Sequence, residues 1–285
     1  MPSFPADDES VLDYFEVESL REAPLKGEMS SPPGKQRTYS IMIYYTPEFA
    51  EVTPNIDDFI DQVIAETNQG YANSLLPITI EKLCSEQTPF NDSDDSMALF
   101  DKFAHFKGSY DALRNTADAA ALFTIKMKNC GIAIGSSFDT GLTFSLIKKS
   151  CALGYFSFGH EIAHNLGAQH DPKYSNNLNF PNGHGHLIER GTHYLGLRTI
   201  LAYSSPGHQW RVNYYSNPRV NHPYTGTPTG VEGLSDNAAV LLRNIDSLAS
   251  LGNETASCKD MLQGQFTISK YIHFLVELKC FRFFN

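Results

Sequence analysis

The part of the chain that most constrains its fold is a histidine-rich motif in residues 157–171, SFGHEIAHNLGAQHD. On an α-helix, His160 and His164 lie four residues apart on one face, so both imidazoles can bind a single metal ion. At about 100° per residue, Phe158 and Ile162 fall on the opposite face, where they can enter the core. The motif therefore predicts a helix with a metal-binding stripe on one side and an apolar stripe on the other.

The residues that follow this helix can complete the metal site. Gly167 can adopt the left-handed conformation that ends a helix, and the resulting turn brings His170 back toward the same ion as a third ligand. Three neutral imidazoles and a water molecule describe an open, catalytic zinc site, so we expect one zinc ion. Glu161 stands beside the first histidine, where its carboxylate can reach a zinc-activated water rather than the metal.

Neither helical spacing nor a glycine turn places the other potential metal ligands. Glu189 is an alternative to His170 as third ligand, but no visible turn brings it to the helix. Residues 183–186, GHGH, could hold a second ion, yet their glycines are flexible and their histidines lack helical spacing. Residues 91–95, NDSDD, do not have the D-x-D-x-D-G frame of a calcium loop, so we interpret them as a solvated acidic loop.

Composition limits the classes of protein and partner. The 285 residues are 41% hydrophobic and 19% charged, which is typical of a globular protein. The 22 basic and 32 acidic residues give a net charge of −10, which argues against a nucleic-acid or anionic-membrane partner. No run of about 18 apolar residues that could span a membrane occurs, and the first residues lack the basic and apolar regions of a signal peptide.

The pattern along the chain predicts three regions. Residues 1–36 are acidic and then rich in serine, proline and glycine, so we expect a poorly ordered leader or precursor remnant. Strands and helices then alternate, which favours an α/β domain with a mostly parallel sheet. The expected strands are 39–45, 76–83, 120–127, 130–135 and 143–147, and the expected helices are 53–73, 96–106, 109–116 and 154–166.

The second half of the chain shows less regular patterning. Residues 172–233 are rich in asparagine, proline, glycine and tyrosine, and we expect them to be irregular. A helix is expected from Ser235, ending at Gly252. The tail 253–285 holds two of the five cysteines, and no role can be assigned to it from its sequence.

The motif, with Asp171 at its end, resembles the metzincin zinc endopeptidases of the reprolysin/adamalysin-like branch. Residues 198–203, RTILAY, resemble the methionine turn that lies beneath the zinc in this family, although Leu201 stands where the family has methionine. Leucine and methionine have similar volumes, so we expect a slightly altered site with a cost below about 1.5 kcal/mol. Further matching segments are 41–46, 130–133, 214–218, Gly230 and 236–238.

The resemblance covers roughly residues 38–252 and implies a catalytic domain over 37–252. This domain would have a twisted, mostly parallel sheet and the active-site helix in an N-terminal subdomain. An irregular C-terminal subdomain would end in a helix. The resemblance also implies secretion, a protein or peptide as substrate and, in our interpretation, a monomer.

The activity implied is hydrolysis of peptide bonds through a zinc-activated water, with Glu161 as general base. Tyr203 lies two residues after Leu201, where astacin- and serralysin-like metzincins carry a tyrosine that can touch zinc. By that resemblance its hydroxyl would bind zinc and then stabilise the oxyanion; a tyrosine that only packs the turn is the alternative. An extended substrate would pair with the edge strand that contains Gly131, Ile132 and Ala133. Residues 198–206 would line the pocket just beyond the cleaved bond.

The resemblance also suggests a disulfide between Cys130 and Cys151, for which two buried thiols are the alternative. Closing that loop would stabilise the fold by ~3 kcal/mol. Free thiols would favour an intracellular peptidase. Because Leu201 replaces the methionine, a catalytically silent, zinc-containing binding protein of the same fold also stays open.

Overall fold

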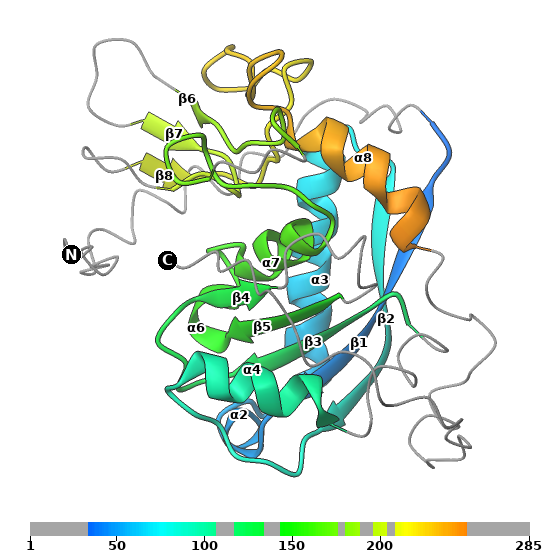
Figure 1. The fold of residues 1–285 in the computed structure, drawn as a ribbon, viewed down its shortest axis with the longest axis vertical. Helices are drawn as coiled ribbons and strands as arrows, with labels where there is room; N and C mark the ends of the chain where they lie inside the picture. Colours follow the sequence, from blue (N-terminus) through cyan, green and yellow to red (C-terminus); the bar gives the residue numbers. More distant parts are fainter. Residues whose placement is uncertain are drawn as a thin grey trace. The chain divides into compact units, whose positions relative to one another are not determined.

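A computed structural model of the protein describes residues 34–106, 117–133, 143–175, 180–188, 196–203 and 209–249. Its main element is a five-stranded sheet with the strand order β2-β1-β3-β5-β4 (Figure 1). The strands are β1 (Arg37–Tyr45), β2 (Ile78–Gln87), β3 (Ala119–Thr124), β4 (Gly131–Ala133) and β5 (Phe144–Lys148). Neighbouring strands run parallel except β4, which pairs antiparallel with β5. The predicted α/β class and mostly parallel sheet are therefore confirmed.

Helices cover both faces of this sheet. Successive side chains of a strand point to opposite faces, so apolar residues form a core on each side. In β3, Ala121 and Phe123 join the core beneath the helices α3 (Ile56–Asn73) and α7 (Ser157–Asn165). Leu122, between them, enters the other core. The helix α4 (Ser96–Ala104) packs over that second face (Figure 1). Because both faces are covered, every residue of β3 is buried, as is common in parallel sheets.

The irregular region expected over 172–233 contains a small second sheet. Its strands are β6 (Leu187–Ile188), β7 (Gly196–Arg198) and β8 (Gln209–Arg211), in the order β6-β7-β8. Strands of two or three residues are too short to produce a period-two pattern, so the expectation of an entirely irregular region was wrong.

Other elements differ from expectation mainly at their ends. Two short helices, α2 (Pro47–Glu51) and α6 (Lys149–Ala152), were not predicted, because a single turn gives no amphipathic period. The last helix, α8 (Asn237–Leu248), ends before Gly252, and Asp236 caps its start by accepting from the Ala239 amide. The helix expected at 109–116 lies outside the described residues. Among those residues, no helix is both long and apolar enough to cross a membrane.

Asp92 contradicts the interpretation of residues 91–95 as a solvated loop. Its side chain is buried and accepts hydrogen bonds from the backbone amides of Ile125 (2.5 Å) and Lys126 (3.2 Å). These two amides belong to the residues directly after β3. One carboxylate accepts from both of them and so satisfies two backbone donors at once. Asp95 is exposed and caps α4 by accepting from the amides of its first turn.

Candidate metal centre

The helix α7 carries the motif and begins at Ser157, directly after Phe156, whose φ of 58° ends the preceding segment. Phe158 and Ile162 are fully buried in the core, as the spacing predicted. The helix stops at Asn165, and Gly167 has a φ of 90°, in the left-handed region where glycine is favoured. The chain therefore reverses at the glycine that the sequence indicated.

The helix α8 holds the returning chain in place. Asn244 donates to the carbonyl of Leu166 at 2.9 Å, and Asn237 donates to the carbonyl of Gln169 at 3.2 Å. Both asparagines are buried. These two side-chain amides bind backbone carbonyls before and after the chain reversal at Gly167. Two different turns of α8 therefore fix the position of His170.

The side chains of His160, His164 and His170 converge. Their Nε2 atoms are 3.0 Å apart between His160 and His164, 2.8 Å between His164 and His170, and 3.1 Å between His160 and His170. Tetrahedral coordination with metal–nitrogen bonds of about 2.0–2.1 Å has edges of roughly 3.3 Å. The three nitrogens therefore fit one ion.

The protonation of the histidines suits metal binding. The Nδ1 atom of His160 lies 2.8 Å from the Ile200 carbonyl, and that of His164 lies 2.8 Å from the Ala168 carbonyl. A carbonyl only accepts, so Nδ1 carries the proton and Nε2 presents a lone pair to the centre. Burial lowers the pKa of all three imidazoles, that of His164 to about 4, which keeps them neutral.

No second cluster of three His, Cys, Asp or Glu side chains with metal-binding geometry exists within the described ranges. His184, from the GHGH segment, is buried, and its Nδ1 lies 2.9 Å from the carbonyl of His170. It therefore supports the backbone of the third histidine instead of forming another site. Glu189, the alternative third ligand, lies outside the described residues.

Glu161 lies beside the histidines and against β4. Its side chain is buried, and burial raises its pKa to about 8, while the positive charge of Arg211 acts in the opposite direction. A Cβ added to Gly131 would lie 2.5 Å from both Cγ and Cδ of Glu161. Only glycine leaves room for this carboxyl group. The predicted substrate-binding residues Gly131, Ile132 and Ala133 form β4, which is at the end of the strand order, next to β5.

Tyr203 and Asp171 connect the turn to the third histidine. The Tyr203 hydroxyl lies 2.7 Å from Nε2 of His170. The backbone amide of Tyr203 donates to the carboxylate of Asp171 at 3.0 Å, and Asp171 is buried. The aspartate at the end of the motif thus fixes the tyrosine on the same side as the converging nitrogens.

Leu201 lies in the turn beneath the histidines. It is fully buried in the core that contains Phe158 and Ile162. The segment around Gly185 packs directly on the turn, because a Cβ there would lie 2.5 Å from the Ala202 nitrogen and 2.7 Å from the Leu201 carbonyl carbon. The turn is thus tightly packed, with a buried leucine at position 201.

The disulfide suggested between Cys130 and Cys151 is present, with the two Cα atoms 5.4 Å apart. It joins the residue before β4 to α6, the short helix that precedes α7. Cys84 is also disulfide-bonded, to a partner outside the described residues.

Arg198 belongs to the segment 198–206 that the sequence predicted to line the pocket, but its contacts, and the neighbouring Tyr155 and Arg211, were not found from the sequence. Arg198 is buried and donates to the Tyr155 hydroxyl at 2.9 Å and to the Ala202 carbonyl at 3.0 Å. Arg211 donates to the Tyr155 carbonyl at 2.9 Å, and its guanidinium carbon lies 4.3 Å from the centre of the same ring. A single arginine in a region without periodicity, such as Arg211, gives no signal that could have identified it.

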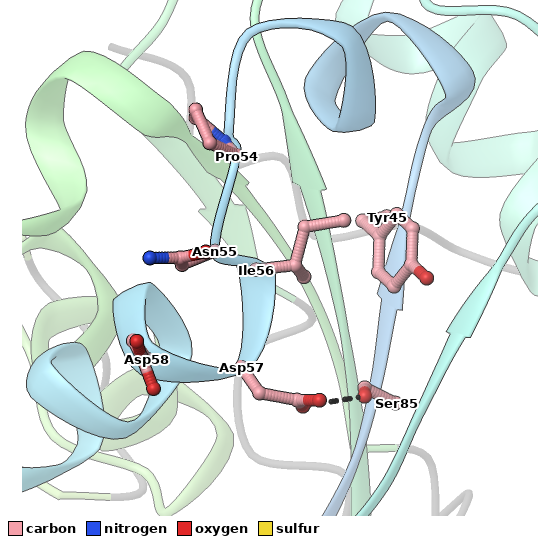
Figure 2. A pocket seen from close by; sticks show the side chains of 7 residues that line it. All are labelled: Tyr45, Pro54, Asn55, Ile56, Asp57, Asp58 and Ser85. Carbon is pink, nitrogen blue, oxygen red and sulfur yellow. Dashed lines mark hydrogen bonds between the residues drawn. The ribbon is translucent and has the colours of Figure 1, made fainter.

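A separate pocket of about 400 Å³ lies at the start of α3 (Figure 2). Asp57 in this pocket accepts from the Ser85 hydroxyl and the Lys82 ammonium, both at 2.9 Å. Its charge is therefore already compensated, and no histidine of the motif reaches it. The lining residues are Tyr45, Pro54, Asn55, Ile56, Asp57, Asp58 and Ser85.

Comparison with known proteins extends these observations. Residues 35–216 match the family model Reprolysin_5, described as metallo-peptidase family M12. The chain is 32% identical over 203 residues to a peptidyl-Asp metalloendopeptidase of Stenotrophomonas maltophilia, an alignment that covers 69% of this chain and 48% of the relative. A protein of the same name from Xanthomonas campestris pv. campestris is 32% identical over 202 residues, covering 69% and 47%.

The chain thus spans about half the length of these curated relatives. A solved structure described as "Structure of a chaperone-substrate complex" is similar in fold, with a TM-score of 0.58 and 18% identity. That likeness covers 76% of this chain and 36% of the other.

Proposed function

Because the chain belongs to metallopeptidase family M12, we propose that it is a zinc-dependent endopeptidase that hydrolyses peptide bonds. The observation that carries this proposal is the convergence of three neutral imidazoles at one point, beside the buried carboxyl group of Glu161. His160, His164 and His170 would hold the ion, and three imidazoles with an open fourth position are the donor set of catalytic zinc. The name of the relatives supports cleavage next to aspartate.

Zinc at this centre would supply Lewis acidity, which makes water more acidic and a carbonyl carbon more electrophilic. Glu161 would accept the proton of the attacking water and then deliver it to the leaving amine. Its raised pKa suits both steps, since a base with a pKa near the working pH takes up and releases a proton readily. The Tyr203 hydroxyl would donate a hydrogen bond to the oxyanion that develops on the carbonyl.

The substrate would bind in extended form along β4. Main-chain groups of an edge strand can pair with a peptide, which aligns the peptide without reading its sequence. Gly131, the first residue of this strand, lies against Glu161, so a peptide on β4 would pass the proposed base. We therefore keep Gly131, Ile132 and Ala133 as proposed substrate-binding residues.

We propose residues 37–252 as the catalytic domain, with 1–36 as a leader and 253–285 as a tail of unknown role. The disulfides of Cys130, Cys151 and Cys84 support an oxidising compartment, and therefore secretion. The expected monomer stays a prediction.

The test combines metal analysis with proteolysis. The purified protein should contain about one zinc per chain and cleave an unfolded protein substrate until a chelator is added. Glu161→Gln should retain the zinc and lose cleavage, whereas Glu81→Gln, at an exposed position of β2, should behave like the unchanged protein. Zinc-loaded protein without any cleavage would favour the silent binding protein instead, and full activity in Glu161→Gln would exclude the proposed base.

A further inference from the structure

The peptide group between Ala202 and Tyr203 is bound at both of its polar atoms. Its carbonyl oxygen, on Ala202, accepts from Nη1 of Arg198 at 3.0 Å. Its N–H, on Tyr203, donates to the carboxylate of Asp171, also at 3.0 Å. A peptide group is planar, so binding its oxygen and its hydrogen prevents the plane from rotating about the line between the two Cα atoms. The direction in which the Tyr203 side chain leaves the backbone is therefore set from two sides.

The side chain fixed in this way belongs to the metal centre. The Tyr203 hydroxyl lies 2.7 Å from Nε2 of His170, and the two ring centres are 4.2 Å apart. Because Asp171 directly follows His170, the first of the two contacts joins the tyrosine to the third histidine. The second contact joins it to β7, in which Arg198 is the last residue. The hydroxyl is thus placed by two separate segments of the chain.

Arg198 is itself held in one orientation. It is only 3% exposed, and its guanidinium also donates from Nε to the carbonyl of Gln209 at 3.2 Å and from Nη2 to the hydroxyl of Tyr155 at 2.9 Å. All three nitrogens of one planar group are therefore bound to three segments, which are the turn, β8 and the residues before α7. A planar fork held in this way cannot turn, so it fixes the carbonyl of Ala202.

We propose that Arg198 is a positioning residue, which holds the Ala202–Tyr203 peptide so that the Tyr203 hydroxyl points at the reacting carbonyl oxygen of the substrate. This inference rests on the proposed function, in which that hydroxyl donates to the developing oxyanion. A hydrogen bond of this kind acts mainly in the transition state. Loss of Arg198 should therefore lower kcat and leave KM nearly unchanged, whereas a general disturbance of the fold lowers the amount of active protein.

The first experiment is a double-mutant cycle on a fluorogenic peptide, with rates expressed per bound zinc. Tyr203→Phe should lower kcat about 100-fold, the usual effect of removing one oxyanion donor. Arg198→Met has a similar length and no donor, and it should lower kcat about 10- to 100-fold with KM within about two-fold. In the Tyr203→Phe background it should cause almost no further loss. Arg198→Lys, which keeps one donor group, should recover part of the rate.

Arg219→Met is the matched control. This arginine is also bound through two nitrogens, at 2.8 Å and 2.9 Å, but its partner is the carboxylate of Asp236 at the start of α8. Its loss should lower the thermal midpoint and keep kcat. An equal loss of kcat from Arg198→Met in both backgrounds, or a rise in KM without a fall in kcat, would overturn the assignment.

A second experiment uses zinc-free protein and needs no activity. Hydrogen–deuterium exchange of the Tyr203 amide measures how often its bond to Asp171 opens. Arg198→Met should accelerate this exchange about 10-fold, because the peptide plane is then held at one end only. The Ala239 amide, which donates to Asp236 at 2.9 Å, should keep its rate. An unchanged rate at Tyr203, or the same acceleration at both amides, would contradict the proposal.

A milder variant covers the case in which Arg198→Met does not fold. Tyr155→Phe removes one acceptor of the guanidinium and keeps the ring, and it should accelerate exchange of the Tyr203 amide in the same direction; no acceleration would again count against Arg198. If the unchanged protein cleaves no peptide, the proposed function fails, and the exchange comparison still decides whether Arg198 holds the turn.

Discussion

The contact between Gly131 and Glu161 allows a sharp test of the proposed general base. A Cβ at position 131 would lie 2.5 Å from Cγ and Cδ of Glu161, whereas carbon atoms in normal contact are about 3.5–4.0 Å apart. Gly131→Ala therefore forces the carboxyl group to move by about 1 Å. A displacement of that size at a reacting group costs about 100-fold in rate, or roughly 2.7 kcal/mol of transition-state stabilisation.

We expect Gly131→Ala to lower kcat about 100-fold on a fluorogenic peptide, with zinc content unchanged because the atoms nearest to the added carbon belong to Glu161 and not to a histidine. Zinc is measured by mass spectrometry, and folding by the thermal midpoint. Gly196→Ala, also in a short strand, is the matched control, since its added carbon meets Cγ of the Gln209 side chain at 3.0 Å and the Ile188 carbonyl oxygen at an ordinary contact distance of 3.6 Å.

A double-mutant cycle separates this cause from a disturbed edge strand. In the Glu161→Ala background the colliding atoms are absent, so Gly131→Ala should have little further effect on the residual rate. An equal loss in both backgrounds would mean that Gly131 acts through peptide binding on β4. Activity of the single variant close to that of the unchanged protein would refute the reasoning altogether.

Three further predictions concern stability and the turn. Asp92→Asn should lower the free energy of unfolding by about 2–3 kcal/mol in urea titrations, because the buried charge that accepts from two backbone amides is lost. The exposed Asp94→Asn should change it by less than about 0.5 kcal/mol. Leu201→Met should cost less than about 1.5 kcal/mol and keep peptide cleavage within a few-fold, since the volume is conserved; loss of cleavage would mean that the turn depends on leucine itself. Burial lowers the pKa of His222, so below pH about 6.5 the unfolded chain binds the additional proton and stability falls with pH. His222→Phe should make that fall shallower below about pH 6.5 in denaturant titrations, and an unchanged slope would contradict this prediction.

The metal helix could be predicted because its information is local. The spacing of His160 and His164, the apolar residues between them and Gly167 all lie within a dozen residues, where helical geometry decides which side chains meet. His170 could be added because one glycine determines the turn. The same holds for β1, whose sequence is rich in isoleucine and tyrosine, residues that favour strands.

The remaining parts depend on contacts that no local pattern encodes. Tyr155 meets Arg198 across 43 positions and Arg211 across 56, through strands too short to show a period. Asp92 looked like one of several exposed acidic residues until the amides after β3 were placed beside it, more than 30 positions along the chain. Sequence patterns thus find residues that cooperate within one element and miss those brought together by the packing of two.

The acidic peptide that we propose as substrate approaches a protein with a formal net charge of −10. Two unit charges 20 Å apart interact by less than about 1 kcal/mol at an effective dielectric constant of 20, and salt screens exposed charges beyond about 8 Å. Most of the carboxylates therefore have little effect at the metal centre, where contacts at short range decide. A negative net charge argues against a partner that must cover a large surface, such as nucleic acid, but it does not determine which peptide side chain fits beside the metal centre. The charge of the whole chain and the charge of the site are separate quantities, and only the second decides what the site recognises.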